Sequence, residues 1–203
     1  MSKIAVDVVL LPDEAMMERV IEANKALVEE FSSEIVLDRK SCLPHISLAM
    51  GVIEEPDVGK IEEILGTVAE ELPIGELQVV GIHTSVNSRG ETVSVFEVKK
   101  TRELQRLHEQ VTMKMMRYFG YDVSKHMIRS EEKVAETTLA WIANYPDKAS
   151  FENFFPHITI GYGEAEETGF PIAFGASRLA LCHLGNHCTC RKVLASVELE
   201  GAS

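Results

Sequence analysis

The sequence predicts an α+β protein whose sheets are mostly antiparallel. Segments with strand-like and helix-like patterns interleave along the 203 residues, and several adjacent strands are close enough in the chain to form hairpins. The sequence also contains a short string that occurs twice. The string Pro-His-Ile-(Ser/Thr)-aliphatic occurs at residues 44–48 and again at residues 156–160, so each half of the chain carries one copy. This spacing indicates an internal duplication and not a solenoid of short repeats.

The first half of the chain opens with an apolar run that Asp7 interrupts. The run is too short and too charged for a signal peptide, so we expect a buried first strand there. After it, apolar residues recur every three or four positions in two segments, which predicts amphipathic helices. The expected elements of this half are a strand at 4–10, a helix capped by Asp13 that runs to about Phe31, the first motif strand ending near Gly51, and a helix that starts at Pro56 and Asp57 and ends before Pro73.

The second half repeats this mixture of strands and helices. Two segments of strand-like composition flank a turn at residues 87–90, where Gly90 favours a hairpin. The stretch between the third helix and the second motif has the weakest pattern. The expected elements of this half are strands at 77–86 and 92–98, a helix capped by Thr101 and terminated by Gly120, a helix at 130–145, the second motif strand, and a final hairpin over 178–199.

Both repeated strings have the composition of short strands. Ile and Thr are β-branched, and aliphatic residues alternate with polar ones. Side chains in a strand point alternately to opposite faces, so His45 and Ser47 share one face while their aliphatic neighbours enter a core. His157 and Thr159 are arranged in the same way. Each motif therefore presents an imidazole and a hydroxyl about 7 Å apart on a rigid element.

A duplicated pair of imidazole and hydroxyl suits a reaction that needs one acid, one base and donors to a charged oxygen. Imidazole titrates near neutral pH, so one copy can be neutral while the other is protonated. Ser47 and Thr159 can donate hydrogen bonds to the charged oxygen. A single histidine on a strand is usually a structural residue, and the second copy is what favours a catalytic role for His45 and His157.

These two motifs resemble the signature of the two-histidine (2H) phosphoesterase superfamily, which includes 2′-5′ RNA ligase-like proteins and cyclic phosphodiesterases. That signature is one His-x-(Ser/Thr)-hydrophobic motif in each half of the chain, and both copies here fit it. The resemblance implies a single domain over residues 1–203, built from two α+β lobes with pseudo-twofold symmetry. One motif strand from each lobe would face a central cleft, with helices outside.

The resemblance also implies chemistry at a phosphodiester, often a 2′,3′-cyclic phosphate or a 2′-5′ linkage. His45 and His157 would be the catalytic acid and base, in an order that the near-symmetric motifs do not fix. Ser47 and Thr159 would bind the phosphate. No metal or cofactor is expected, and the expected partner is a small nucleotide or an RNA end that carries a phosphodiester.

Three classes of function are compatible with these motifs. The leading one is a metal-independent cyclic phosphodiesterase, with 2′-5′ RNA ligation or RNA end processing as a variant. The second is a non-catalytic module that binds a phosphorylated ligand; such modules often lose a motif residue, and none is lost here. The third is a metalloenzyme with His45 and His157 as ligands, but the sequence offers no third ligand at ligand spacing beside either motif.

The composition limits the partners further. A formal net charge of −12 disfavours stable binding to duplex nucleic acid, which relies on Lys and Arg. No apolar run reaches about 18 residues, so we expect no membrane span and a cytoplasmic protein. In that compartment cysteines are reduced. Cys182, Cys188 and Cys190 lie with two histidines in the final hairpin, where a structural zinc site is the less favoured alternative.

Four aromatic residues near the motifs have two interpretations. Phe154, Phe155, Tyr162 and Trp141 could stack against a nucleobase, or they could pack in the core. Aromatic side chains dominate protein cores, so packing is the favoured interpretation.

Overall fold

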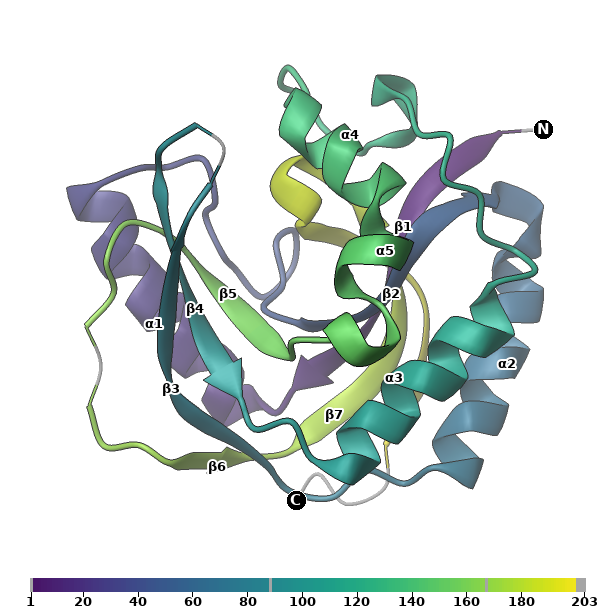
Figure 1. Ribbon diagram of the computed structural model, residues 1–203, viewed down its shortest axis with the longest axis horizontal. Helices are drawn as coiled ribbons and strands as arrows, with labels where there is room; N and C mark the ends of the chain where they lie inside the picture. The colour runs from purple at the N-terminus through teal and green to yellow at the C-terminus, as the bar shows by residue number, and fades with distance from the viewer. Residues whose placement is uncertain (1, 88, 167, 200–203) are drawn as a thin grey trace.

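The computed structural model describes residues 2–87, 89–166 and 168–199, which form two four-stranded antiparallel sheets with helices on their outer faces (Figure 1). The predicted α+β class and its two-lobed arrangement are therefore confirmed. The strands are β1 (Lys3–Pro12), β2 (Ile46–Glu54), β3 (Leu77–Val86), β4 (Thr92–Val98), β5 (His157–Tyr162), β6 (Ile172–Phe174), β7 (Ala176–Leu184) and β8 (Cys190–Glu198). The helices are α1 (Glu14–Glu30), α2 (Val58–Glu71), α3 (Arg102–Met115), α4 (Glu136–Ala143) and α5 (Tyr145–Ala149), with 3₁₀ turns η1 (Glu55–Asp57), η2 (Lys125–Met127), η3 (Phe151–Asn153) and η4 (Asn186–Cys188).

The two sheets have matching strand orders. Sheet A has the order β2-β1-β7-β8, and sheet B has the order β5-β4-β3-β6, with antiparallel pairing throughout. In both sheets the motif strand is an edge strand, with another strand of its sheet on one side only, and β2 contacts β5 where the two sheets meet. This equivalence is the structural form of the repeat in the sequence.

Two helices each pack on the sheet to which their flanking strands do not belong. Helix α1 joins two strands of sheet A, yet it packs mainly on β5 of sheet B. Helix α3 follows β4 of sheet B, yet it packs on β2 of sheet A, beside α2 (Figure 1). One continuous apolar core contains buried residues from both sheets and from all three helices. Each sheet is thus covered by a helix that connects strands of the other sheet.

The local signals in the sequence set several boundaries correctly. The carboxylate of Asp13 accepts a hydrogen bond from the Met16 amide at 2.8 Å and begins α1, and the Thr101 hydroxyl accepts from the Leu104 amide at 3.2 Å and begins α3. The strands of the β3–β4 hairpin have the predicted bounds, and the β7–β8 hairpin begins at Ala176, two residues before the predicted start of the final hairpin, and ends within it. Of the predicted turn at 87–90, residue 88 lies outside the described residues.

Three expectations about elements were wrong. Helix α3 ends at Met115, before Gly120, because Gly120 instead forms two backbone hydrogen bonds with Val52 of β2. The helix expected at 130–145 is shorter and begins at Glu136, and a separate short helix with Pro146 in its first turn follows it. The three-residue strand β6 was not predicted at all, since so short a segment carries little pattern.

The expectation of reduced cysteines was also wrong for one pair. Cys182 of β7 and Cys190 of β8 form a disulfide, because the hairpin brings their Cα atoms to 5.5 Å. Two members of the alternative zinc cluster are therefore bonded to each other, while Cys42 and Cys188 are free. Within the described ranges no helix has the length and apolarity that crossing a bilayer requires.

Candidate functional site

The first motif has the alternating pattern that its sequence predicts. His45 precedes β2 directly, and Ser47 is the second residue of that strand. Both side chains are partly exposed, whereas Ile46 and Leu48 are buried in the main core. The imidazole and the hydroxyl therefore share the inner face of sheet A, which we define as the face that carries the motif side chains.

The second motif repeats this arrangement on sheet B. His157 begins β5, and His157 and Thr159 are partly exposed while Ile158 and Ile160 are fully buried. In the strand pairing, Thr159 lies opposite Val95 of β4, which lies in turn opposite His83 of β3. Residues opposite each other in antiparallel strands point to the same face. His83 therefore stands on the same inner face of sheet B as the motif.

Both motif imidazoles are held by the same backbone contact. His45 Nδ1 donates a hydrogen bond to the carbonyl of Leu43 at 2.8 Å, and His157 Nδ1 donates to the carbonyl of Phe155 at 2.7 Å. A carbonyl oxygen can only accept, so Nδ1 carries the proton and Nε2 keeps its lone pair in the neutral ring. A proline lies between each histidine and its acceptor, which favours an extended conformation for the acceptor residue. The prolines of the repeat thus help to fix the tautomer.

The pKa values of both imidazoles are depressed. Burial lowers the pKa of His45 to about 4, the hydrogen bond to Leu43 opposes this shift, and the nearby charge of His157 lowers the pKa further. Burial also lowers the pKa of His157, against the hydrogen bond to Phe155 and with a further lowering by His83. The two motif histidines are therefore electrostatically coupled, and both are neutral near pH 7 in the unliganded protein.

Two buried polar side chains hold the motif strands from the opposite lobe. His108 of α3 donates from Nδ1 to the carbonyl of Leu48 at 2.7 Å, and Asn24 of α1 donates to the carbonyl of Ile160 at 2.8 Å. Leu48 and Ile160 are the fourth residues of the two motifs. Each crossing helix therefore anchors the equivalent point of a motif strand, a symmetry that the sequence did not reveal.

His108 also connects the first motif to the approach of the second. Its Nε2 accepts a hydrogen bond from the Phe151 amide at 2.7 Å, and its ring stacks on Phe154 with centroids 4.0 Å apart. Both ring nitrogens are thus satisfied in the neutral tautomer, and burial lowers the pKa of this imidazole. His108 is a buried structural histidine that joins β2 to the segment leading into β5.

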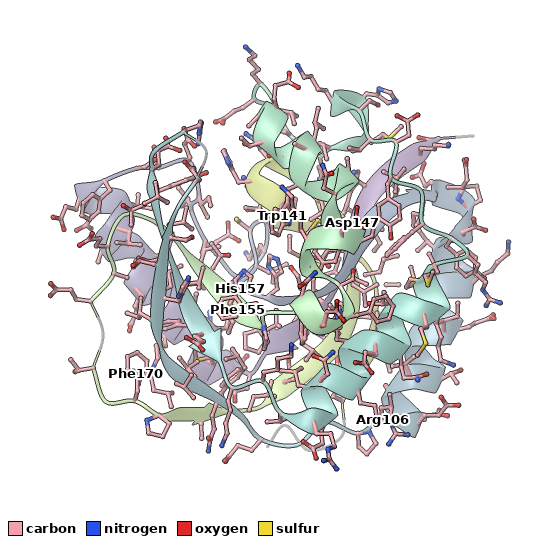
Figure 2. All side chains as sticks on the ribbon, in the orientation of Figure 1. Arg106, Trp141, Asp147, Phe155, His157 and Phe170 are labelled. Atoms are coloured by element: carbon pink, nitrogen blue, oxygen red, sulfur yellow. A yellow bond between two sulfur atoms is a disulfide. The ribbon has the colours of Figure 1, made fainter. Side chains whose placement is uncertain are left out.

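The aromatic residues near the motifs divide into two groups. Phe154 and Tyr162 are buried, as the packing interpretation predicts, whereas Phe155 and Trp141 are about two-fifths exposed, at 41% and 40%. The Phe155 ring lies 5.4 Å from the His157 ring and 5.4 Å from the His83 ring. Figure 2 shows Phe155 and His157 together near the middle of the molecule, below Trp141. Phe155 is therefore the exposed aromatic surface beside the second motif.

Asp7 of β1 is a further residue of the site that the sequence marked only as an interruption of an apolar run. Its side chain is fully buried, and its Oδ2 lies 4.0 Å from His45 Nε2.

No group of three or more His, Cys, Asp and Glu side chains with the arrangement of a metal site is found among the residues that the structure describes.

Sequence comparison identifies no relative of this chain: no family model matches it, and no curated protein matches it. Solved structures do match. E. coli LigT complexed with NADP+ aligns with a TM-score of 0.52 and 15% sequence identity, over 98% of this chain and 99% of the LigT chain. E. coli LigT complexed with 3′-AMP aligns with a TM-score of 0.50 at the same identity and coverage. This chain therefore has the two-lobed fold of LigT, and the fold expected from the resemblance is confirmed.

Proposed function

We propose that this protein is a metal-independent phosphoesterase that opens a cyclic phosphodiester, such as the 2′,3′-cyclic phosphate of a nucleotide or an RNA end. The observation that carries this proposal is the matched pair of imidazoles. His45 and His157 are tied by the same contact, are electrostatically coupled, and each share a face with a hydroxyl. A phosphate held between them has an acid on one side and a base on the other.

Each residue of the pair of motifs has one task in the reaction. The neutral imidazole accepts a proton at Nε2 from a water molecule as the water oxygen bonds to phosphorus. The opposite imidazolium donates its Nε2 proton to the ribose oxygen as the bond from that oxygen to phosphorus breaks. Ser47 and Thr159 donate hydrogen bonds to the non-bridging oxygens, where negative charge accumulates. The product is a ribose monophosphate.

The substrate itself supplies the electrostatic condition for this chemistry. In the unliganded protein both imidazoles have depressed pKa values and are neutral near pH 7. An anionic phosphodiester placed between them favours the charged form and raises these pKa values. Repulsion between the two rings disfavours a second proton. Substrate binding therefore favours protonation of one imidazole, which then holds the proton that the leaving oxygen requires.

Two features support a nucleotide as the source of the phosphate. The neighbouring LigT structures hold 3′-AMP and NADP+, and both of these ligands carry phosphate on a ribose. In this chain the exposed ring of Phe155 adjoins His157 and offers a surface on which a base can stack. A small nucleotide fits a chain with a net charge of −12 better than a long duplex does.

Hydrolysis of nucleoside 2′,3′-cyclic phosphates in excess chelator tests the proposal. We expect turnover, and we expect His45→Ala and His157→Ala each to lower kcat by at least about 10²–10⁴-fold, the usual contribution of positioned acid–base catalysis. Ser47→Ala and Thr159→Ala should cost about 10–10³-fold. His126→Ala is the matched control, because His126 is exposed, lies outside both motifs and hydrogen-bonds with the Ser124 hydroxyl.

Other outcomes would point to the other classes. Activity that disappears with chelator and returns with a divalent ion would indicate a metalloenzyme. Tight binding of ribose phosphates without turnover would indicate a binding module. Joining of RNA ends through a 2′-5′ linkage, without hydrolysis of the cyclic phosphates, would indicate a ligase. Normal turnover by both His→Ala variants would remove the motifs from the active site.

A further inference from the structure

His83 is an exposed imidazole that shares the inner face of sheet B with the second motif. It lies on β3, opposite Val95 of β4, which lies in turn opposite Thr159 of β5. Its ring contacts the Phe155 ring edge-on, with the two centroids 5.4 Å apart. Among the described residues it has no hydrogen-bond or ion-pair partner, so both of its ring nitrogens are available to a ligand.

Phe155 connects His83 to the second motif. Its ring, which is 41% exposed, also lies 5.4 Å from the His157 ring, at an interplanar angle of 26°. The two imidazoles therefore adjoin the same aromatic ring, and their centroids are no more than twice that distance apart. The charge of His83 lowers the pKa of His157, which agrees with this proximity. One exposed aromatic surface thus has the motif imidazole and a second imidazole beside it.

This arrangement suits one nucleoside that carries phosphate on both sides of its ribose. A base can stack on the Phe155 ring while the cyclic phosphate of the same nucleoside lies at His157. The 5′ oxygen of that ribose carries a second phosphate in a nucleotide or an RNA strand. Glu97 lies opposite His157 in the strand pairing and therefore on the same face, where its carboxylate repels a second phosphate. His83 is the neighbouring group that can donate a hydrogen bond to it.

We propose that His83 binds the phosphate on the 5′ oxygen of the nucleoside whose cyclic phosphate is opened, so that a 5′-phosphorylated substrate is preferred to one with a free 5′ hydroxyl. This inference rests on the proposed function and deepens it by naming the substrate class. The 5′ phosphate can belong to a free nucleotide or to the next linkage of an RNA strand, and both present anionic oxygens. A charged imidazolium forms a stronger hydrogen bond to such an oxygen than a neutral donor does.

Three substrates with the same base test this assignment: adenosine 2′,3′-cyclic phosphate, its 5′-phosphorylated form, and a dinucleotide that ends in the same cyclic phosphate. We expect kcat/KM to be about 5–15-fold higher for the 5′-phosphorylated substrates, the lower part of the range for a hydrogen bond to a charged group, because His83 is exposed and salt screens it. In His83→Ala this preference should disappear. His83→Gln keeps an N–H donor without the charge and should show an intermediate preference.

The two phosphorylated substrates distinguish the sources of the phosphate. An advantage of the mononucleotide alone, or of the dinucleotide alone, that His83→Ala removes would support the proposal and identify the source.

The matched control is Thr84→Ala. Thr84 follows His83 on β3 and is also exposed, but it points to the opposite face of the sheet. We expect this variant to keep the native preference. A native protein that does not distinguish the substrates, or a preference that survives in His83→Ala, would overturn the proposal. Equal losses for all three substrates in His83→Ala would also overturn it, because His83 would then only hold Phe155 in place.

Binding measurements separate this proposal from the proposed function. Adenosine 3′,5′-bisphosphate and 3′-AMP differ only in the 5′ phosphate, and their binding does not depend on turnover. Calorimetric titration should show tighter binding of the bisphosphate to the native protein, and the difference should disappear in His83→Ala. That result in a protein that opens no cyclic phosphate would refute the proposed function and retain His83 as a phosphate ligand. Equal affinities in a protein that does open cyclic phosphates would refute the role of His83 and retain the function.

Discussion

Each motif histidine is held in one orientation by its immediate neighbours in the chain. The carbonyl two residues earlier holds Nδ1, and the intervening proline restricts the conformation of that carbonyl's residue. The sequence contains both prolines, and the strand alternation of His45, Ser47, His157 and Thr159 follows from its pattern alone. The role of the prolines becomes visible only with the hydrogen bonds, because a proline before a strand has many other uses.

The pH dependence expected for the proposed reaction follows from the depressed pKa values of these histidines. Because kcat/KM reports the free protein, which must acquire one proton, we expect its maximum below pH 6.5 and a fall of about tenfold per pH unit above the relevant pKa. Because bound phosphate raises the imidazole pKa values, the maximum of kcat should lie at higher pH. Steady-state kinetics between pH 4.5 and 9 measure both profiles. Coincident maxima, or a kcat/KM that rises up to pH 8, would contradict this account.

Asp7 is conspicuous in the sequence, but its position beside His45 is not predictable from the sequence. A single carboxylate inside an apolar strand is unusual, because buried charges are rare. Its proximity to His45 depends on the register between β1 and β2, which includes a bulge after Val8. The sequence alone does not determine that register. The residue was therefore noticeable from the sequence, but its relation to the site was not.

Elements with strong local signals were predictable, and elements fixed by distant contacts were not. The capping residues Asp13 and Thr101 correctly predicted the starts of α1 and α3, and the β3–β4 hairpin has the expected bounds. Gly120, in contrast, pairs with β2, a contact between segments far apart in sequence. The Cys182–Cys190 disulfide likewise depends on hairpin register. Capping residues therefore predicted where α1 and α3 begin, whereas a contact distant in sequence is associated with the early end of α3.

The anchoring of β2 by α3 leads to a prediction about stability. His108→Ala removes the partners of the Leu48 carbonyl and the Phe151 amide, so we expect the free energy of unfolding near pH 7.5 to fall by about 2–4 kcal/mol. Burial lowers the pKa of His108, so the unfolded chain binds a proton on this residue more readily than the folded one. Its contribution to stability is therefore complete above about pH 6.5 and is lost as the pH falls toward the folded-state pKa.

Urea unfolding at pH 7.5 and pH 5 measures this effect. The stability difference between native protein and His108→Ala should shrink at pH 5. Asn24→Ala is the matched control, since Asn24 anchors β5 from α1 in the same way but does not titrate. Its stability difference from the native protein should stay constant with pH. A His108→Ala difference that is also constant would show that this histidine keeps its ordinary pKa when the protein folds.

At the scale of the whole molecule, the crossed helices join the two lobes into one core. Buried residues of both sheets belong to a single apolar cluster, and each motif strand loses the helix that packs on it if the other lobe unfolds. We therefore expect one cooperative unfolding transition. Native-state hydrogen exchange should give equal opening free energies for the central amides of β1 and β4. Lower protection of β4 alone, or two resolved transitions, would show that the lobes unfold separately.

The crossed packing also bears on how such a molecule could have arisen. One lobe by itself leaves its motif strand without a helix packed on it, because the helix between its strands packs on the motif strand of the other sheet. Two separate copies could protect each other only by exchanging helices, which is the arrangement of a domain-swapped dimer. Fusion into one chain makes that exchange intramolecular and independent of protein concentration. An exchange of this kind would place the two motif strands at equivalent edges of their sheets, as they are here.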